Sequence, residues 1–67
     1  QRMITILRNA NFPQWFSIEF TDKLGFMDKV EEVKGRAMAI KVAKKLAKKE
    51  KIDHINVDGF IAETEEL

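Results

Sequence analysis

The sequence predicts an α+β fold in which one amphipathic helix packs on one face of a small antiparallel sheet, in the order β-β-(β)-α-β-(β). Residues 15–21 alternate apolar and polar side chains with the period of a strand. Residues 39–51 repeat alanine every fourth position, as one face of a helix does. With 67 residues and no cysteine, residues 1–67 form one small domain whose stability depends on its apolar core.

Two strands are expected before residue 22. Residues 3–7 are apolar and rich in β-branched side chains, which favours a strand, and the Asn and Pro residues of 9–13 predict a turn. The second strand, 15–21, has two distinct faces because side chains alternate along a strand. Its apolar face holds Phe16, Ile18 and Phe20, and its polar face holds Trp15, Ser17, Glu19 and Thr21.

Residues 26–36 admit two interpretations. The spacing of Phe26, Val30 and Val33 is helical, which would give one long helix from about residue 28 to residue 50. Gly35 argues against that helix, since an internal glycine costs about 1 kcal/mol relative to alanine. The alternative is a third strand or irregular edge, with the helix starting near Gly35 or Arg36, and it is slightly favoured because three strands cover a helix better than two.

The helix itself has two faces that do not interleave. Ala39, Ala43 and Ala47 lie on the apolar side together with Ile40, Val42 and Leu46. The opposite side carries six lysines: Lys41, Lys44, Lys45, Lys48, Lys49 and Lys51. No glycine follows the helix, so its end is less clearly marked than its body.

The C-terminal residues predict a hairpin. Residues 54–57 and 60–63 flank Asp58-Gly59, and an Asp-Gly pair suits a two-residue type I′ turn. A bend in one irregular strand is the alternative. Residues 64–67 are expected to be a frayed acidic tail. The expected core consists of Ile4, Ile6, Phe16, Ile18, Phe20, Val42, Ala43, Leu46, Ile55, Val57 and Ile61.

The net charge of +1 conceals a strong asymmetry. Residues 34–51 hold eight basic residues and one acidic residue, which gives +7. The rest of the chain holds four basic and ten acidic residues, which gives −6. A domain polarised in this way can steer an anionic partner toward one side, or favour self-association.

The lysine side of the helix is the first candidate site. Lys41, Lys44, Lys45, Lys48 and Lys49 could meet the phosphates of DNA or RNA, and the expected function is a non-enzymatic binding module of this kind. The alternative for this surface is a solvated face that only keeps a small domain soluble. A membrane-surface helix is disfavoured because the apolar side is rich in alanine and lacks aromatic anchors.

The polar face of the second strand is the other candidate site. An exposed Trp15, with Ser17 and Glu19 beside it, could anchor a protein partner or a second copy of the chain. The alternative is that Trp15 covers the sheet edge or the 9–13 turn. An exposed edge strand could serve the same contact, and an inhibitor that presents its acidic surface to a host enzyme is a further possibility.

Catalysis, metals and cofactors are not expected. His54 is the only histidine, Ser17 the only serine, and the spacing of Asp53, His54 and Asp58 is not that of a metal site. No phosphate-binding glycine loop or small-molecule site is evident. No run of 18 apolar residues could span a membrane, and no secretory signal begins the chain, so a cytoplasmic protein is expected.

Three features occur in a recognisable order: Trp15 in an early strand, alanines at 39, 43 and 47, and Asp58-Gly59-Phe60-Ile61 near the end. In this the chain, from Trp15 onward, resembles a family of small uncharacterised bacterial and phage domains. The resemblance implies a β-β-(β)-α-β arrangement and a microbial or phage origin, and it implies no activity. The threonine helix cap of that family is absent here, so the resemblance does not fix where the helix begins.

Overall fold

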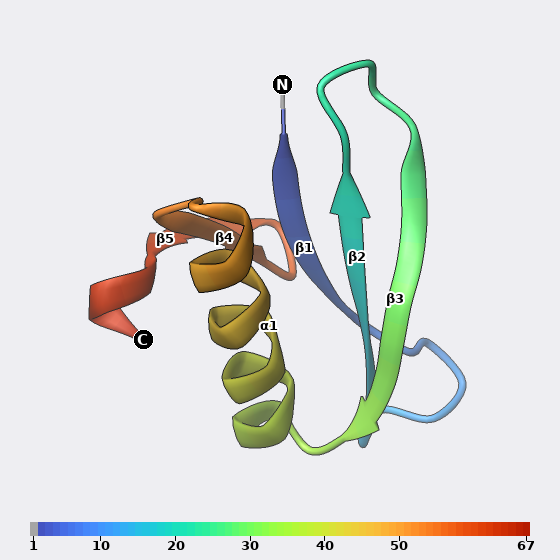
Figure 1. The fold of residues 1–67 in the computed structure, drawn as a ribbon. Helices are drawn as coiled ribbons and strands as arrows, with labels where there is room; N and C mark the ends of the chain where they lie inside the picture. Colours follow the sequence, from blue (N-terminus) through green and yellow to red (C-terminus); the bar gives the residue numbers. More distant parts are fainter. Residues whose placement is uncertain (1) are drawn as a thin grey trace.

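The computed structural model describes residues 2–67, which form a five-stranded sheet with one α-helix packed on one face (Figure 1). This is the α+β architecture that the sequence predicts. Along the sheet the strands lie in the order β3-β2-β1-β4-β5. The elements are β1 (Met3–Arg8), β2 (Trp15–Thr21), β3 (Met27–Lys34), α1 (Arg36–Glu50), β4 (His54–Val57), β5 (Phe60–Glu63) and a 3₁₀ turn, η1 (Thr64–Glu66).

Strands β1, β2 and β3 form an antiparallel meander. β1 and β2 pair without interruption, with Ile6 opposite Ile18. The pairing of β2 with β3 shifts in the middle, because Ile18 lies opposite Glu31 whereas Glu19 lies opposite Lys29. Val30 is therefore an extra residue, a β-bulge, in the outer strand. Residues 27–34 are thus a third strand, as the favoured interpretation predicts.

The prediction of an entirely antiparallel sheet is wrong for one pair of strands. β4 runs parallel to β1, with Thr5 opposite Asn56, so the sheet is mixed. The physical reason is the crossover, since α1 carries the chain back across one face of the sheet before β4 begins. β1 thereby becomes the central strand, with β2 on one side and β4, which follows the helix, on the other.

Helix α1 begins and ends in unusual backbone conformations. Gly35 is the N-cap, with φ 93° and ψ 137°, and no side chain caps the first turn. Lys51 ends the helix in the left-handed conformation, with φ 59° and ψ 45°. The N–H of Ile52 then donates to the carbonyl of Ala47 over 2.9 Å, which satisfies a carbonyl at the helix end as in a Schellman motif.

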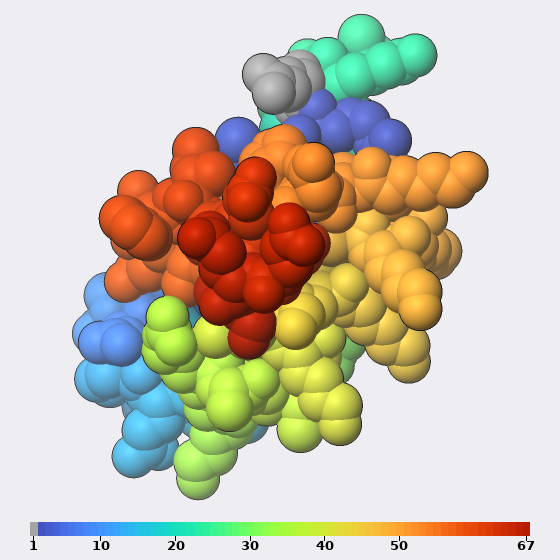
Figure 2. All heavy atoms as spheres, turned by 90° about the vertical axis from the view of Figure 1, so that its left-hand side faces the viewer, coloured from blue at the N-terminus to red at the C-terminus, as the bar shows by residue number. Residues whose placement is uncertain are grey.

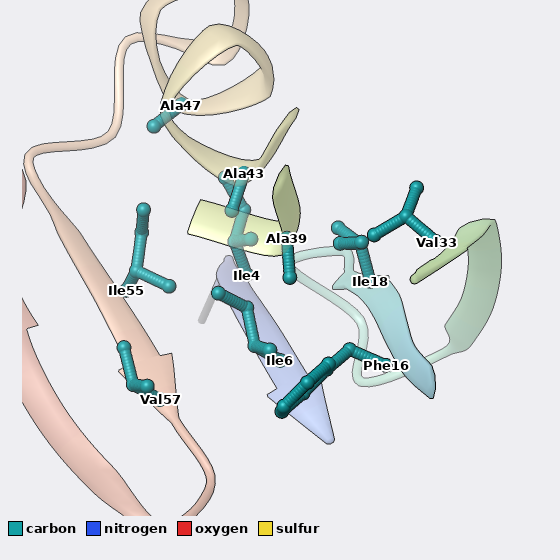
Figure 3. Packing of buried hydrophobic residues seen from close by; sticks show 10 residues of the cluster. All are labelled: Ile4, Ile6, Phe16, Ile18, Val33, Ala39, Ala43, Ala47, Ile55 and Val57. Atoms are coloured by element: carbon teal, nitrogen blue, oxygen red, sulfur yellow. The ribbon is translucent and has the colours of Figure 1, made fainter. Parts of the chain in front are cut away.

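The core lies between α1 and the sheet (Figure 3). Three fully buried alanines, Ala39, Ala43 and Ala47, face the sheet and let the helix backbone approach it closely. Figure 3 shows Ala47 above Ile55 of β4 and Ala39 beside Ile18 of β2. The buried apolar residues are Ile4, Ile6, Phe16, Ile18, Val33, Ala39, Ala43, Ala47, Ile55 and Val57.

The predicted core differs from this set at its margins. Phe20, Val42 and Leu46 pack against the core but are only partly buried. The prediction that Ile61 belongs to the core is wrong, because Ile61 lies opposite Asn56 on the sheet face away from α1 and is 60% exposed. Its neighbour Ala62, opposite the buried Ile55, faces the helix side instead.

The C-terminal hairpin forms as predicted, and the residues after it form the 3₁₀ turn η1. Val57 pairs with Phe60 across Asp58-Gly59, and both turn residues have positive φ, 52° and 93°. Two contacts connect residues 64–67, for which the sequence predicts fraying, to the rest of the domain. The N–H of Thr64 donates to the carbonyl of Asp53 over 2.9 Å, and Leu67 packs against the core.

Candidate nucleic-acid interface

The lysines of α1 lie on its solvent side, as the sequence predicts. The alanine face fixes the rotation of the helix, so the residues opposite the alanines point away from the sheet. Figure 2 shows long side chains of this yellow-to-orange segment projecting from the surface. The exposed lysines of the helix are Lys41, Lys44, Lys45, Lys48 and Lys49, and the adjoining Lys51 is exposed as well.

None of these six ammonium groups lies within 4.0 Å of a carboxylate oxygen of the described residues 2–67. Two cations elsewhere in the domain, Arg2 and Lys29, do have such partners. Nη2 of Arg2 donates to Oε1 of Glu50 over 2.6 Å and to the Glu50 carbonyl over 2.8 Å, joining the helix end to β1. Lys29 lies 4.0 Å from Glu32. We call these six side chains, Lys41, Lys44, Lys45, Lys48, Lys49 and Lys51, the lysine face, which gathers six cations without an ion pair to the described residues on one side of α1.

The lysine face is bordered by one carboxylate on each flank. On one flank, Lys44 and Lys48 line a hollow of about 360 Å³ together with Glu65 of the 3₁₀ turn. Figure 2 shows that this red C-terminal segment lies beside the helix. On the other flank, Lys45 and Lys49 line a hollow of about 290 Å³ together with Glu31 of β3. Lys41 lines neither hollow.

Glu31 faces the helix side because it lies opposite Ile18 and two positions before Val33, and the bulge in β3 brings Val30 to the same side. In a regular strand Val30 and Glu31 would point to opposite faces, but the extra residue interrupts the alternation. Both side chains consequently line the same hollow beside α1, with Val42 and Leu46 as its apolar floor.

The outer face of the sheet, which α1 does not cover, carries the second candidate site. Trp15 is 39% exposed and, with Asn9, Phe12 and Glu32, lines a hollow of about 340 Å³. Two hydrogen bonds hold the 9–14 loop against β2: Trp15 N–H to Phe12 O, 2.9 Å, and Asn9 N–H to Trp15 O, 2.8 Å. Ser17 and Glu19 follow Trp15 on the same face and are half-buried. Trp15 therefore both adjoins the turn and remains accessible.

The only histidine has a local structural partner. Nδ1 of His54 lies 3.0 Å from Oδ1 of the neighbouring Asp53, and this hydrogen bond lowers the pKa of the Asp53 carboxyl. Among residues 2–67 no three potential ligands gather where they could hold a metal ion. No helix of the described chain has both the length and the apolar character needed to cross a membrane.

The residues beside the candidate sites that sequence reasoning missed are brought there by tertiary contacts. Glu31 and Glu65, which border the lysine face, come from elements on opposite sides of α1. Glu32 joins Trp15 from the neighbouring strand. Glu32 had a usable signal, because alternation within a third strand places it on the face opposite to that of Val33.

Comparison with protein-family models, with curated proteins and with solved structures found no significant match to this chain.

Proposed function

We propose that this domain binds the phosphate backbone of nucleic acid through the lysine face of α1. The observation that supports the proposal is that these exposed lysines have no carboxylate within ion-pair distance in the described chain, whereas Arg2 and Lys29 do. An unpaired ammonium group can bind a phosphate without first breaking an internal ion pair. Each contact releases counterions condensed on the nucleic acid, which drives the association.

The composition of the face favours binding that does not depend on base sequence. Lysine is a flexible point charge and lacks the planar donor fork with which arginine recognises guanine. The exposed side of the helix between residues 41 and 49 holds no Asn, Gln or Arg. Backbone contacts of this kind position a protein on nucleic acid but carry little sequence information.

The carboxylates on the two flanks define how wide the contact is. Glu31 and Glu65 would repel phosphates that extend beyond the helix in either direction. A nucleic acid would therefore follow the ridge of α1 rather than wrap around the domain.

The test is a salt series on a short DNA duplex, comparing two variants of equal net charge. For Lys44→Gln with Lys48→Gln, we expect weaker binding and a slope of log K against log salt that is shallower by about 1.8, or about 0.9 for each phosphate that is no longer neutralised. The matched control, Lys29→Gln with Lys34→Gln, removes two charges from β3 and should leave the slope unchanged. Affinity that does not fall between ~50 and ~200 mM salt, or equal effects of the two variants, would contradict the proposal.

A second candidate function is protein recognition by the outer sheet face. The observation that favours it is the hollow at Trp15 and Phe12, since accessible aromatic side chains at the rim of a concavity are typical anchors of protein contacts. Trp15 is the only tryptophan in the chain, so its fluorescence reports directly on this hollow.

For this second candidate, the measurement is a pull-down from extract of the source cells, with wild type and with Trp15→Ala. We expect Trp15→Ala to lose a specific partner while its circular dichroism stays that of the wild type. Met38→Ala, which removes an exposed apolar side chain from the helix, is the control and should retain the partner. Identical sets of partners for wild type and Trp15→Ala would remove the outer face from consideration.

A further inference from the structure

The two edges of the sheet differ in how they are protected against pairing with another strand. The β3 edge carries the bulge at Val30 and five charged side chains, and both features prevent edge-to-edge association. The charged residues are Asp28, Lys29, Glu31, Glu32 and Lys34. The β5 edge has no bulge, and its one charged residue, Glu63, is the last of the strand. Its first three residues, Phe60, Ile61 and Ala62, are apolar, and Phe60 and Ile61 are 75% and 60% exposed.

Along the hairpin, hydrogen-bonded and non-hydrogen-bonded residue pairs alternate, and this alternation shows which backbone groups β5 presents at the edge. The N–H of Asp58 donates to the carbonyl of Ile6 in β1, so the backbone groups of Ile55 and Val57 point the other way, toward β5. Their partners across the hairpin are Ala62 and Phe60. Consequently the N–H and C=O of Ile61 point outward, and no bond to either is found within residues 2–67.

The neighbouring N–H groups along this edge are already occupied. The N–H of Glu63 donates to Oε1 of Glu66 over 3.0 Å, and that of Gly59 donates to Oδ1 of Asn56 over 2.8 Å. The edge therefore offers one residue, Ile61, with both a free donor and a free acceptor. A partner strand has to be centred on it.

The side chains beside Ile61 form a matched pair of large and small groups. Phe60 and Ala62 both point to the helix side, where they line a hollow of about 460 Å³ with Val57, Leu67 and Arg36. The ring of Phe60 is three-quarters exposed at the rim of this hollow, while Ala62 leaves room within it.

We propose that β5 pairs with β5 of a second copy of this chain, antiparallel, about a two-fold axis at Ile61. In this register Ile61 faces Ile61 of the second copy, and the two exchange both of their free hydrogen bonds. Phe60 then lies opposite Ala62 of the second copy, so that each ring enters the hollow of the other molecule. The strand is thus self-complementary, because the same two-fold axis pairs the free backbone groups of Ile61 and places each Phe60 opposite Ala62 of the other copy.

The same register avoids a meeting of like charges. Glu63 falls opposite Gly59 of the second copy rather than opposite another carboxylate. A two-fold contact also uses the β5 edge of both copies, so it gives a dimer and cannot extend into a filament. The two sheets join into one sheet of ten strands, with both α1 helices on the same side.

The absence of cysteine from the chain allows a direct test of this register. Facing Cα atoms of a hydrogen-bonded antiparallel pair lie about 5.5 Å apart, within the ~4.4–6.8 Å that a disulfide spans. Under mild oxidation we expect Ile61→Cys to form disulfide-linked dimers on the order of 10-fold faster than Val30→Cys, an exposed position on the opposite edge. Equal rates for the two variants would overturn the proposal, since they would reflect random collision.

A second measurement detects the dimer by its mass, without a disulfide. In light scattering over a concentration series, the wild type should rise from 7.8 kDa toward twice that mass. Ile61→Lys should stay at the monomer mass, because two ammonium groups would face each other at the axis, whereas Val30→Lys should behave like the wild type. Circular dichroism confirms that each variant is folded. Growth beyond the dimer, or the same mass series for both variants, would refute a two-fold contact at β5.

Discussion

Gly35 holds the junction between β3 and α1 in a conformation that other residues avoid. With φ 93° and ψ 137° it lies in a region that is essentially open only to glycine. Its N–H donates to the carbonyl of Gln14 over 2.7 Å, and its own carbonyl accepts from the N–H of Ala39 over 3.1 Å. One residue thus ties the 9–14 loop, the end of β3 and the first turn of the helix together.

Replacing Gly35 with alanine should therefore destabilise the domain through its backbone alone. A Cβ at this position would have no atom within 4 Å, so no steric clash contributes. We expect Gly35→Ala to lower the free energy of unfolding by about 1–3 kcal/mol, measured by urea denaturation. Lys34→Ala, at the preceding exposed position, should change it by less than about 0.5 kcal/mol. Equal stability of the two variants would show that the junction relaxes without strain.

Single residues differ in how well the sequence predicts them. The side on which Trp15 lies follows from the alternation of its strand, and Asp58-Gly59 follows from the φ values its turn requires. Ile61 could not be placed in this way. Alternation assigns residues 60 and 62 to one face and 61 to the other, but only the pairing with β4 decides which of these faces the helix.

At the scale of elements, the helix is the most predictable and β3 the least. The alanine stripe of α1 has the period of a helix and nothing interrupts it. In β3 the bulge brings Val30 and Glu31 to the same face, with Val33 also facing the core. Apolar residues three apart then share a face, which imitates helical spacing. The sequence was ambiguous here because a bulge breaks the period of two by which strands are recognised.

The parallel pairing of β4 with β1 was beyond sequence reasoning for a different reason. The sequence of neither strand indicates whether the pair is parallel or antiparallel, since short apolar strands occur in both kinds of pair. The direction follows from the length and path of α1 between them. The residues that form strands were therefore predictable, whereas the order and direction of the strands in the sheet depend on the path of the helix that connects them.

For the molecule as a whole, the distribution of charge matters more than its total. The net charge of +1 would not attract nucleic acid, but the concentration of lysines on α1 creates a local positive field. The sequence predicts this polarity along the chain. It does not predict that Glu31 and Glu65 would fold against the two flanks of the lysines.

Neutralising these flanking carboxylates should strengthen nucleic-acid binding. For Glu31→Gln with Glu65→Gln we expect affinity for a short duplex to rise about twofold to fivefold at low salt, since each exposed charge contributes up to about 1 kcal/mol. Glu19→Gln with Glu32→Gln changes the net charge equally on the outer sheet face and should have a smaller effect. If both pairs raised affinity to the same extent, net charge rather than the local field would govern binding.

The pairing of β1 with β4 also bears on the order in which the chain folds. Thr5 and Asn56 lie near opposite ends of the sequence, whereas β1, β2 and β3 are joined by short loops. The meander can form from local contacts, but the C-terminal hairpin must wait for a loop that spans most of the chain to close. Ile55 is fully buried only when that closure is complete. The hairpin that offers its outer edge to a second copy is therefore expected to be among the last parts of the domain to dock, so folding and dimer assembly converge on the same strands.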